Sequence, residues 1–266
     1  MNKPIKNEIS TMSPLFRFTL GLADDAVVLS HRLSQWCSNA PYLEEDIALS
    51  NIALDYLGRA RMFYQYASEI QKNELEQEQA SSEDDLAYLR NEREYTNLLI
   101  HELPKGDFAF SMVRQYFIDV FYQLYLTQLI KSSDETIAAI AAKAIKETNY
   151  HVKRSEPWIH QLLEGTDESR RRVLNALDEL KDFIGELFEM PIWEQELLAS
   201  GISVDRKALE PAWNNQVQAL LAKSNVEFGD SKLQIRGGRE GIHTEHLGHM
   251  LCEMQFLQRS YPNMQW

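Results

Sequence analysis

Apolar residues recur at intervals of three and four along most of the chain, and this periodicity restricts the fold more than any other feature. Leu22, Ala26, Leu29 and Leu33, for example, fall on one stripe of a helix. The 11 glycines and 8 prolines gather at a few breaks, and no segment alternates apolar and polar residues as a strand does. The sequence therefore predicts an all-α fold, with helices over residues 15–36, 42–70, 86–100, 107–131, 135–163, 166–189, 193–198, 205–222 and 239–260.

Several of these predicted helices are long and are joined by short connections, which favours an antiparallel helical bundle. The polar, acid-rich stretch 72–85 interrupts the pattern, and we interpret it as a loop rather than as the solvated end of a helix. We expect a single domain over residues 13–266, preceded by a flexible amino-terminal extension over residues 1–12.

The charge of the chain excludes one large class of function. Lys and Arg total 27 against 40 for Asp and Glu, so the net charge is −13. A nucleic-acid-binding protein needs a basic face to displace counterions from phosphates, and this composition does not favour one. No apolar run approaches the roughly 18 residues that a membrane-spanning helix requires. We expect a protein of the cytoplasm that binds neither nucleic acid nor membrane.

Polar residues at core-facing positions of the predicted helices are the candidates for a functional site, because an unpaired buried charge is costly. Two pairs stand four residues apart and so share a helix face. Two further acids lie inside apolar stretches of the first and fourth long helices. The set comprises Asp25, Asn51, Asp55, Asp119, Glu147 and His151.

This arrangement resembles a degraded form of the di-iron bundle plan, in which two helices each supply a Glu and two others each supply a Glu-x-x-His. Thr148 stands where that motif would place a glutamate before His151, and the helix over 42–70 contains no histidine. Three interpretations remain open: a solvated surface pair, a working metal site, or a relic cluster whose charges pair internally, with Arg59 or Lys146 as partners. We favour the relic cluster, and we expect no metal and no catalytic residue in this chain.

The literal Glu-x-x-His of the sequence lies near its end, at Glu240 and His243, and two more histidines follow at His246 and His249. Histidines three apart rotate by about 60° per step around a helix, so the three span a broad sector. Glu240 lies beside glycines at the start of the predicted helix. We therefore expect these imidazoles to bond to acids or backbone groups rather than to hold a metal.

Seven stretches together resemble one known family: TLGLADDAVVLSHRLSQWC, APYLEEDIALSNIALDYLGRAR, RNEREYTNLLI, GDFAFSMVRQYFIDVFY, AKAIKETNYHVKRS, LLEGTDESRRRVLNAL and GIHTEHLGHMLCEMQFLQRSYP. On these stretches the chain is similar to the C-type (PaaC) component of the multicomponent 1,2-phenylacetyl-CoA epoxidase of aerobic phenylacetate degradation. The resemblance covers about residues 13–266.

The resemblance implies a ferritin-like bundle that lacks iron ligands and pairs with a related catalytic subunit, the A-type component, which carries the di-iron centre and the CoA-ester site. It implies that the complex adds one oxygen atom of O₂ across the aromatic ring, with electrons from a reductase subunit. This chain would then be a structural, non-catalytic member of a hetero-oligomer. We expect the aromatic helix over 108–125 and the run 250–266 to contribute to the interface.

Two other functions remain open at this stage. The chain could be a stand-alone ferritin-like oxidase with two metals, which bound iron would reveal. Alternatively, it could be a helical binding module unrelated to oxygen chemistry, which partners from outside an epoxidase would reveal.

Overall fold

The computed structural model describes residues 9–75, 80–229, 231, 233–262 and 264. Helices make up most of this part of the chain, and no strand occurs within it. The prediction of an all-α fold is therefore confirmed. Within the same residues, no helix is both long enough and apolar enough to cross a membrane.

The first two long helices form one half of the bundle. Helix α1 (Pro14–Ser34) begins at a capping serine, because the Ser13 side chain accepts a hydrogen bond from the Phe16 amide at 3.2 Å. It packs along α2 (Leu43–Glu74), which returns in the opposite direction after a short connection. Helix α4 (Leu99–Glu102) and helix α8 (Ile192–Ala199) also contact α1, so α1 is buried along nearly its whole length.

Helices α5 and α6 form the other half of the bundle. Helix α5 (Phe108–Leu129) and helix α6 (Glu135–Glu164) begin at capping aspartates, Asp107 and Asp134, whose side chains accept backbone N–H bonds. They pack against each other, and α7 (Asp167–Leu180) and α9 (Glu210–Ala222) cover further sides of α5. Most aromatic residues of α5 are therefore core residues, whereas Phe108 and Phe110 are partly exposed, and a contribution of the segment 108–125 to an interface stays a prediction.

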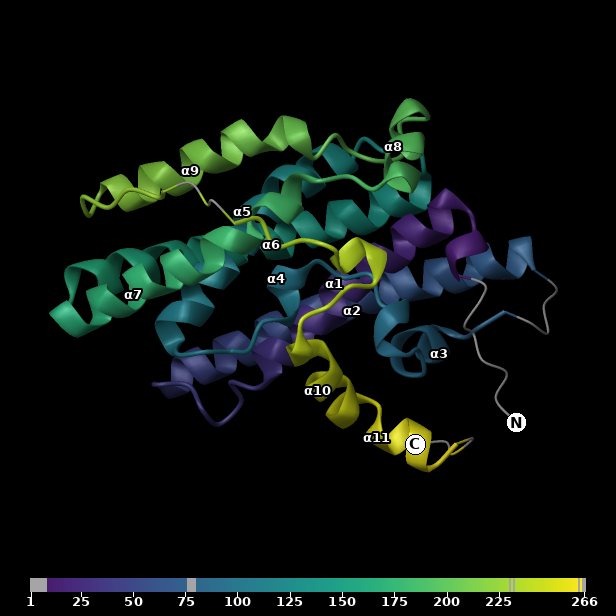
Figure 1. Ribbon diagram of the computed structural model, residues 1–266, viewed down its shortest axis with the longest axis horizontal. Helices are drawn as coiled ribbons and strands as arrows, with labels where there is room; N and C mark the ends of the chain where they lie inside the picture. The colour runs from purple at the N-terminus through teal and green to yellow at the C-terminus, as the bar shows by residue number, and fades with distance from the viewer. Residues whose placement is uncertain (1–8, 76–79, 230, 232, 263, 265–266) are drawn as a thin grey trace.

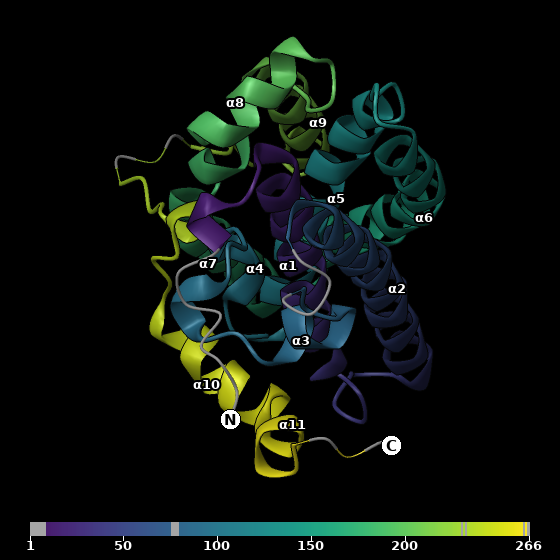
Figure 2. The same ribbon diagram turned by 90° about the vertical axis from the view of Figure 1, so that its right-hand side faces the viewer.

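The long helices run together through the molecule, with the shorter ones arranged around them (Figures 1 and 2). The arrangement is an antiparallel, ferritin-like helical bundle with additional helices, as expected. Short 3₁₀ turns link several elements. They comprise η1 (Ile9–Thr11), η3 (Glu92–Glu94), η4 (Lys181–Phe183), η5 (Gly185–Phe188), η6 (Lys207–Leu209) and η7 (Gly238–Glu240).

The predicted single helix over 86–100 is wrong. The structure has helix α3 (Glu83–Tyr88), then η3 and an extended stretch before α4. Side chains form hydrogen bonds with backbone groups that would be paired with one another in a helix. Arg90 donates to the carbonyls of Leu86 and Glu94, and Asp24 accepts from the Thr96 amide at 2.8 Å.

Two other predicted helices are shorter than expected. The helix over 166–189 ends at Leu180 and continues as 3₁₀ turns. The helix over 239–260 begins only at Glu245, as α10 (Glu245–Met254) followed by α11 (Phe256–Ser260). Gly241 has a φ of 73°, a left-handed conformation that ends η7 before α10 can start.

The acidic stretch 72–85 is partly helical, so its interpretation as a loop is wrong at both ends. The last turn of α2 includes residues 72–74, and α3 begins at Glu83 with a capping box made by Ser82 and Asp85. Residues 76–79 lie outside the described residues. Of the expected extension 1–12, residues 1–8 also lie outside them, whereas Met12 is buried against the core. Residues 263, 265 and 266 of the run 250–266 also lie outside the described residues. The contribution of that run to an interface stays a prediction.

Candidate functional site

Polar side chains from α2, α5 and α6 meet in the middle of the bundle. His151 Nε2 lies 2.9 Å from Asp55 Oδ2, and its other ring nitrogen, Nδ1, lies 3.5 Å from Asp119 Oδ1. The same Asp119 oxygen accepts from Tyr56 Oη at 2.7 Å and from Gln115 Nε2 at 2.8 Å. We call these five residues the bundle cluster. All except Asp55 are buried, so the cluster is a polar island in an apolar core.

Arg59 brings a permanent positive charge to the bundle cluster from one turn further along α2. Its guanidinium carbon lies 4.6 Å from the ring centroid of Tyr56 and 5.4 Å from that of Tyr122. Its Nη2 atom donates to the Thr148 hydroxyl on α6 at 2.8 Å. Thr148 thus accepts a hydrogen bond from an arginine where the di-iron plan would need a glutamate.

The hydrogen bonds of the bundle cluster determine the protonation states of His151 and Tyr56. Burial alone would lower the pKa of His151, but hydrogen bonds to Asp119 and Asp55 outweigh burial and raise this pKa above its usual value. A protonated imidazole can donate from both ring nitrogens, which suits the two carboxylates beside it. Burial and the charge of Asp119 raise the pKa of Tyr56 well above its usual value, so Tyr56 stays protonated and donates.

The bundle cluster does not fit a pair of metal ions. Both nitrogens of His151 face carboxylates, and a ligand nitrogen needs a free lone pair directed at the metal. The Arg59 guanidinium lies over Tyr56, which donates to Asp119, and it supplies positive charge that a bound metal would otherwise supply. Among the described residues, no group of three His, Cys, Asp or Glu side chains has the geometry to hold a metal ion.

The structure brings together three of the six candidate residues, Asp55, Asp119 and His151. Asn51 lies on the exposed face of α2. Glu147 is half-buried beside the cluster, and burial raises its pKa although Arg59 partly offsets that effect. Asp25 belongs to a second polar network in the bundle.

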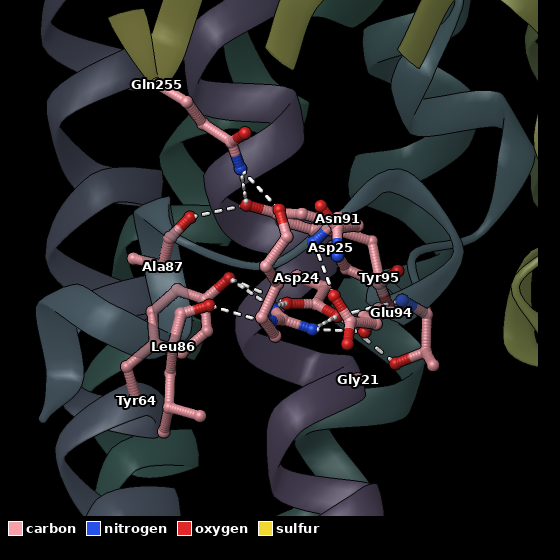
Figure 3. A network of polar contacts seen from close by, with 12 residues as sticks. Gly21, Asp24, Asp25, Tyr64, Leu86, Ala87, Asn91, Glu94, Tyr95 and Gln255 are labelled. Atoms are coloured by element: carbon pink, nitrogen blue, oxygen red, sulfur yellow. Dashed lines mark hydrogen bonds and ion pairs between the residues drawn. The ribbon is translucent and has the colours of Figure 1, made fainter. Parts of the chain in front are cut away.

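Asp24 and Asp25 anchor that second network on α1, and both are buried. Asp24 forms an ion pair with the fully buried Arg90 and accepts from Tyr64 Oη at 2.6 Å. Figure 3 shows Asp24 between Tyr64 and Tyr95, with Gln255 reaching in from the carboxyl-terminal segment. The network therefore ties the end of the chain to the first helix.

Asp25 makes the corresponding connection one residue further along α1. It forms an ion pair with Arg239, and Tyr122 Oη donates to it at 3.0 Å. Burial opposes ionisation, but Arg239 and other nearby donors outweigh burial and hold the pKa of Asp25 below its usual value. Arg239 Nη1 also donates to the Gly21 carbonyl at 2.9 Å. Asp25 thus holds the segment before α10 rather than a metal.

The three carboxyl-terminal histidines do not form a cluster. His243 is held between Glu102 Oε2 and the Tyr95 carbonyl, each 2.9 Å from one of its ring nitrogens. His249 is exposed, and the backbone carbonyl of His246 accepts a hydrogen bond from Arg32 at 2.8 Å. His243 therefore helps to dock the carboxyl-terminal segment onto α4.

Several buried acids outside the candidate set also serve as structural anchors. Glu186 accepts from the Leu99 amide at 2.7 Å and from the Gly238 amide at 2.7 Å, and Glu194 is paired with Arg206 at 2.7 Å. Glu194 is followed by Gln195 and Glu196, so the local sequence does not mark it as a buried acid. The amides that Glu186 holds lie far away in the sequence.

Comparison with known proteins gives one family over essentially the whole chain. Residues 2–266 match the family described as "Phenylacetic acid catabolic protein". The chain is also similar to the C component of the 1,2-phenylacetyl-CoA epoxidase of Escherichia coli (strain K12). The two sequences are 44% identical over 255 residues, which cover 96% of this chain and 100% of the relative.

Proposed function

Because the chain belongs to the family of phenylacetic acid catabolic proteins, we propose that it is the C component of a 1,2-phenylacetyl-CoA epoxidase, the name that its Escherichia coli relative carries. Its role is in phenylacetate catabolism. The comparisons do not favour a stand-alone oxidase or a binding module unrelated to oxygen chemistry. A cytoplasmic location is part of the same proposal.

Within that complex, the chain acts as a structural subunit and performs no chemistry. The observation that carries this proposal is the pairing of His151 with two carboxylates beside the buried Arg59. Positive charges of the protein itself now balance the acids that a dimetal centre would use. The site is therefore a source of rigidity between α2, α5 and α6.

The partner proposed for this chain is the related catalytic subunit, which the resemblance identifies as the holder of the di-iron centre and the CoA-ester site. A di-iron site needs fixed second-shell groups and a shaped, dry cavity. A rigid neighbouring bundle supports both by packing against the catalytic subunit. An obligate pair of this kind buries about 2,000 Å² or more in total.

Metal analysis of the separated and assembled proteins tests this proposal. The chain is purified alone, incubated with ferrous iron under argon, desalted and measured by elemental analysis, and the same is done for its complex with the catalytic subunit. We expect iron in the complex at the stoichiometry of the catalytic subunit and only background iron in this chain alone. A stoichiometric pair of irons on the isolated chain contradicts the proposal.

A matched variant makes the test sharper. Arg59→Met removes the guanidinium and places an unbranched apolar side chain in the same core position. We expect the variant to remain free of stoichiometric iron, because His151 stays paired with both carboxylates and Thr148 cannot replace a glutamate. The melting temperature of the variant is recorded alongside, so that loss of the fold is not mistaken for loss of a site.

A further inference from the structure

The carboxyl-terminal segment, residues 237–262, lies outside the bundle of long helices, with α10 and α11 at the edge of the molecule (Figures 1 and 2). Polar side chains anchor it to distant parts of the chain: Arg239 pairs with Asp25, His243 with Glu102, and Gln255 donates to the Tyr95 hydroxyl. Among these anchoring groups, only the imidazole of His243 ordinarily changes its charge near neutral pH.

The contacts of His243 suit the protonated form of its ring. The side chain is fully buried, with Nδ1 2.9 Å from Glu102 Oε2 and Nε2 2.9 Å from the Tyr95 carbonyl oxygen. An ionised carboxylate and a backbone carbonyl can only accept hydrogen bonds. An imidazolium donates from both nitrogens, whereas a neutral imidazole donates from one and directs a lone pair from the other. A neutral His243 would therefore point a lone pair at an acceptor.

Glu102 depends on His243 for its charge-assisted hydrogen bond. Its carboxylate also accepts from the Asn97 side chain and from the Thr244 amide, but both of these donors are neutral. Arg32 on α1 attracts Glu102, yet its guanidinium donates to backbone carbonyls instead. Among the described residues, no other cation forms an ion pair with Glu102. Loss of the His243 proton thus leaves a buried carboxylate without a cationic donor, which is costly.

The charged groups around His243 act in the same direction as its hydrogen bonds. Burial alone would lower the pKa of His243, but Glu102, the Tyr95 carbonyl and Asp24 on α1 outweigh burial and raise it above its usual value. Burial lowers the pKa of the neighbouring His101 on α4 to about 4, so His101 is neutral at neutral pH. His101 therefore adds no change of charge as the pH rises above neutral.

We infer that His243 is a pH-sensitive clasp, whose imidazolium holds the carboxyl-terminal segment on α4 near neutral pH and whose loss of a proton at alkaline pH favours release of the segment. Release uncovers the surfaces that Leu247, Met250 and Leu251 of α10 bury in the docked state. The clasp is a property of this chain alone and is independent of the function proposed for the complex.

Proton linkage determines how the release depends on pH. In the released segment, His243 has the ordinary histidine pKa of about 6.5. Because the pKa in the docked state is higher, the stabilisation is complete below about pH 6.5 and is lost as the pH rises through the docked pKa. Between these two values, the equilibrium constant for release rises by close to tenfold for each pH unit. Above the docked pKa it rises no further.

Amide hydrogen exchange of the full-length chain tests the clasp at pH 6, 7, 8 and 9, with labelling from milliseconds to hours and correction for the intrinsic exchange rate. His243→Gln removes the titrating ring. The matched control is His249→Gln, which removes an exposed histidine of the same helix. In parallel, an NMR titration of ¹³C-labelled histidine follows the 7 imidazoles of the chain. The signal that His243→Gln lacks identifies His243.

We expect His243 to titrate above pH 6.5, and the protection of α10 amides to fall by close to tenfold per pH unit between about 6.5 and that measured pKa. The His249→Gln chain should show the same fall, and the His243→Gln chain should not. At each pH, α10 should be less protected than α5, because the segment opens without the bundle.

Several results would overturn the clasp. They are a His243 pKa at or below about 6.5, α10 protection that does not change with pH, the same fall in His243→Gln, and equal protection of α10 and α5. Glu102→Gln gives a second test that keeps the histidine. It should lower the measured pKa of His243 and narrow the pH range of the fall to match, and an unchanged pKa would also overturn the clasp.

Discussion

The buried ion pair between Asp24 and Arg90 joins α1 to the segment between α3 and α4, and the structure allows the cost of breaking it to be estimated. The perturbation is Asp24→Asn, which keeps the shape of the side chain and removes its charge. Arg90 is wholly buried, and its other hydrogen bonds include those to the carbonyls of Leu86 and Glu94. Burial alone would lower the pKa of Arg90, but Asp24 and the neighbouring tyrosines outweigh burial and raise it. Because an arginine stays protonated in proteins, the guanidinium remains charged in the variant.

The magnitude follows from which contacts the asparagine can keep. Its carbonyl oxygen can still accept from the Thr96 amide, now 2.8 Å from Asp24 Oδ2, so that hydrogen bond is retained. The charge of Arg90 loses its counter-ion in a site without solvent access. Removing one partner of a buried pair costs about 3–5 kcal/mol, which is a large part of the stability of a typical domain.

Urea unfolding followed by circular dichroism measures the loss, with the slope of the transition checked for a change in the unfolded state. The control is Glu168→Gln, which breaks an exposed pair with Arg171 on α7 and should leave the midpoint unchanged. A loss below about 1 kcal/mol in Asp24→Asn would refute the reasoning, because it would show that Arg90 is solvated or otherwise paired.

Three further perturbations probe other parts of the structure. Asp119 and Asp55 raise the pKa of His151 more than burial lowers it. Protonated His151 therefore stabilises the fold below its unfolded-state pKa of about 6.5. This stabilisation is lost as the pH rises through the higher folded-state pKa. His151→Gln should therefore lower the urea midpoint more at pH 6 than at pH 9, and equal losses at both would count against the charged cluster. Burial raises the pKa of Glu147, so its ionised form weakens the fold at neutral pH; Glu147→Gln should keep or raise the melting temperature at pH 8, and a drop of several degrees would contradict this reasoning. Arg239→Lys cannot reproduce the bonds from Arg239 to Asp25 and Gly21 together, and we expect faster amide hydrogen exchange in residues 237–255, with unchanged exchange in α5 as the internal control.

The sequence predicts the long helices well because their periodicity is local. The helix predicted over 107–131 is observed as Phe108–Leu129, and the one predicted over 135–163 as Glu135–Glu164. The core-facing positions of Asp55, Asp119 and His151 could be predicted from the same local periodicity. Tyr56 and Gln115, which complete the bundle cluster, are missed because pairing between helices depends on how those helices are placed, which periodicity does not give.

The segments that the sequence places wrongly are those whose backbone is held by distant side chains. The amide of Leu98 donates to Asp25 at 2.8 Å, and the amide of Leu99 donates to Glu186 at 2.7 Å. These acids lie far from residues 98 and 99 in the sequence. A local pattern therefore predicts one continuous helix where the structure has an extended stretch before α4. The aromatic content of α5 serves the core of this chain for the most part, because other helices of the same chain surround α5 on several sides.

The proposed structural role predicts that the catalytic subunit depends on this chain for its activity. The most direct test is reconstitution of phenylacetyl-CoA epoxidation with fixed amounts of iron-loaded catalytic subunit and reductase and increasing amounts of this chain. We expect no turnover in its absence, a rise to saturation at a stoichiometric ratio to the catalytic subunit, and the same saturating rate for a chain carrying Glu147→Gln. Full turnover by the catalytic subunit and reductase without this chain would contradict its proposed structural role.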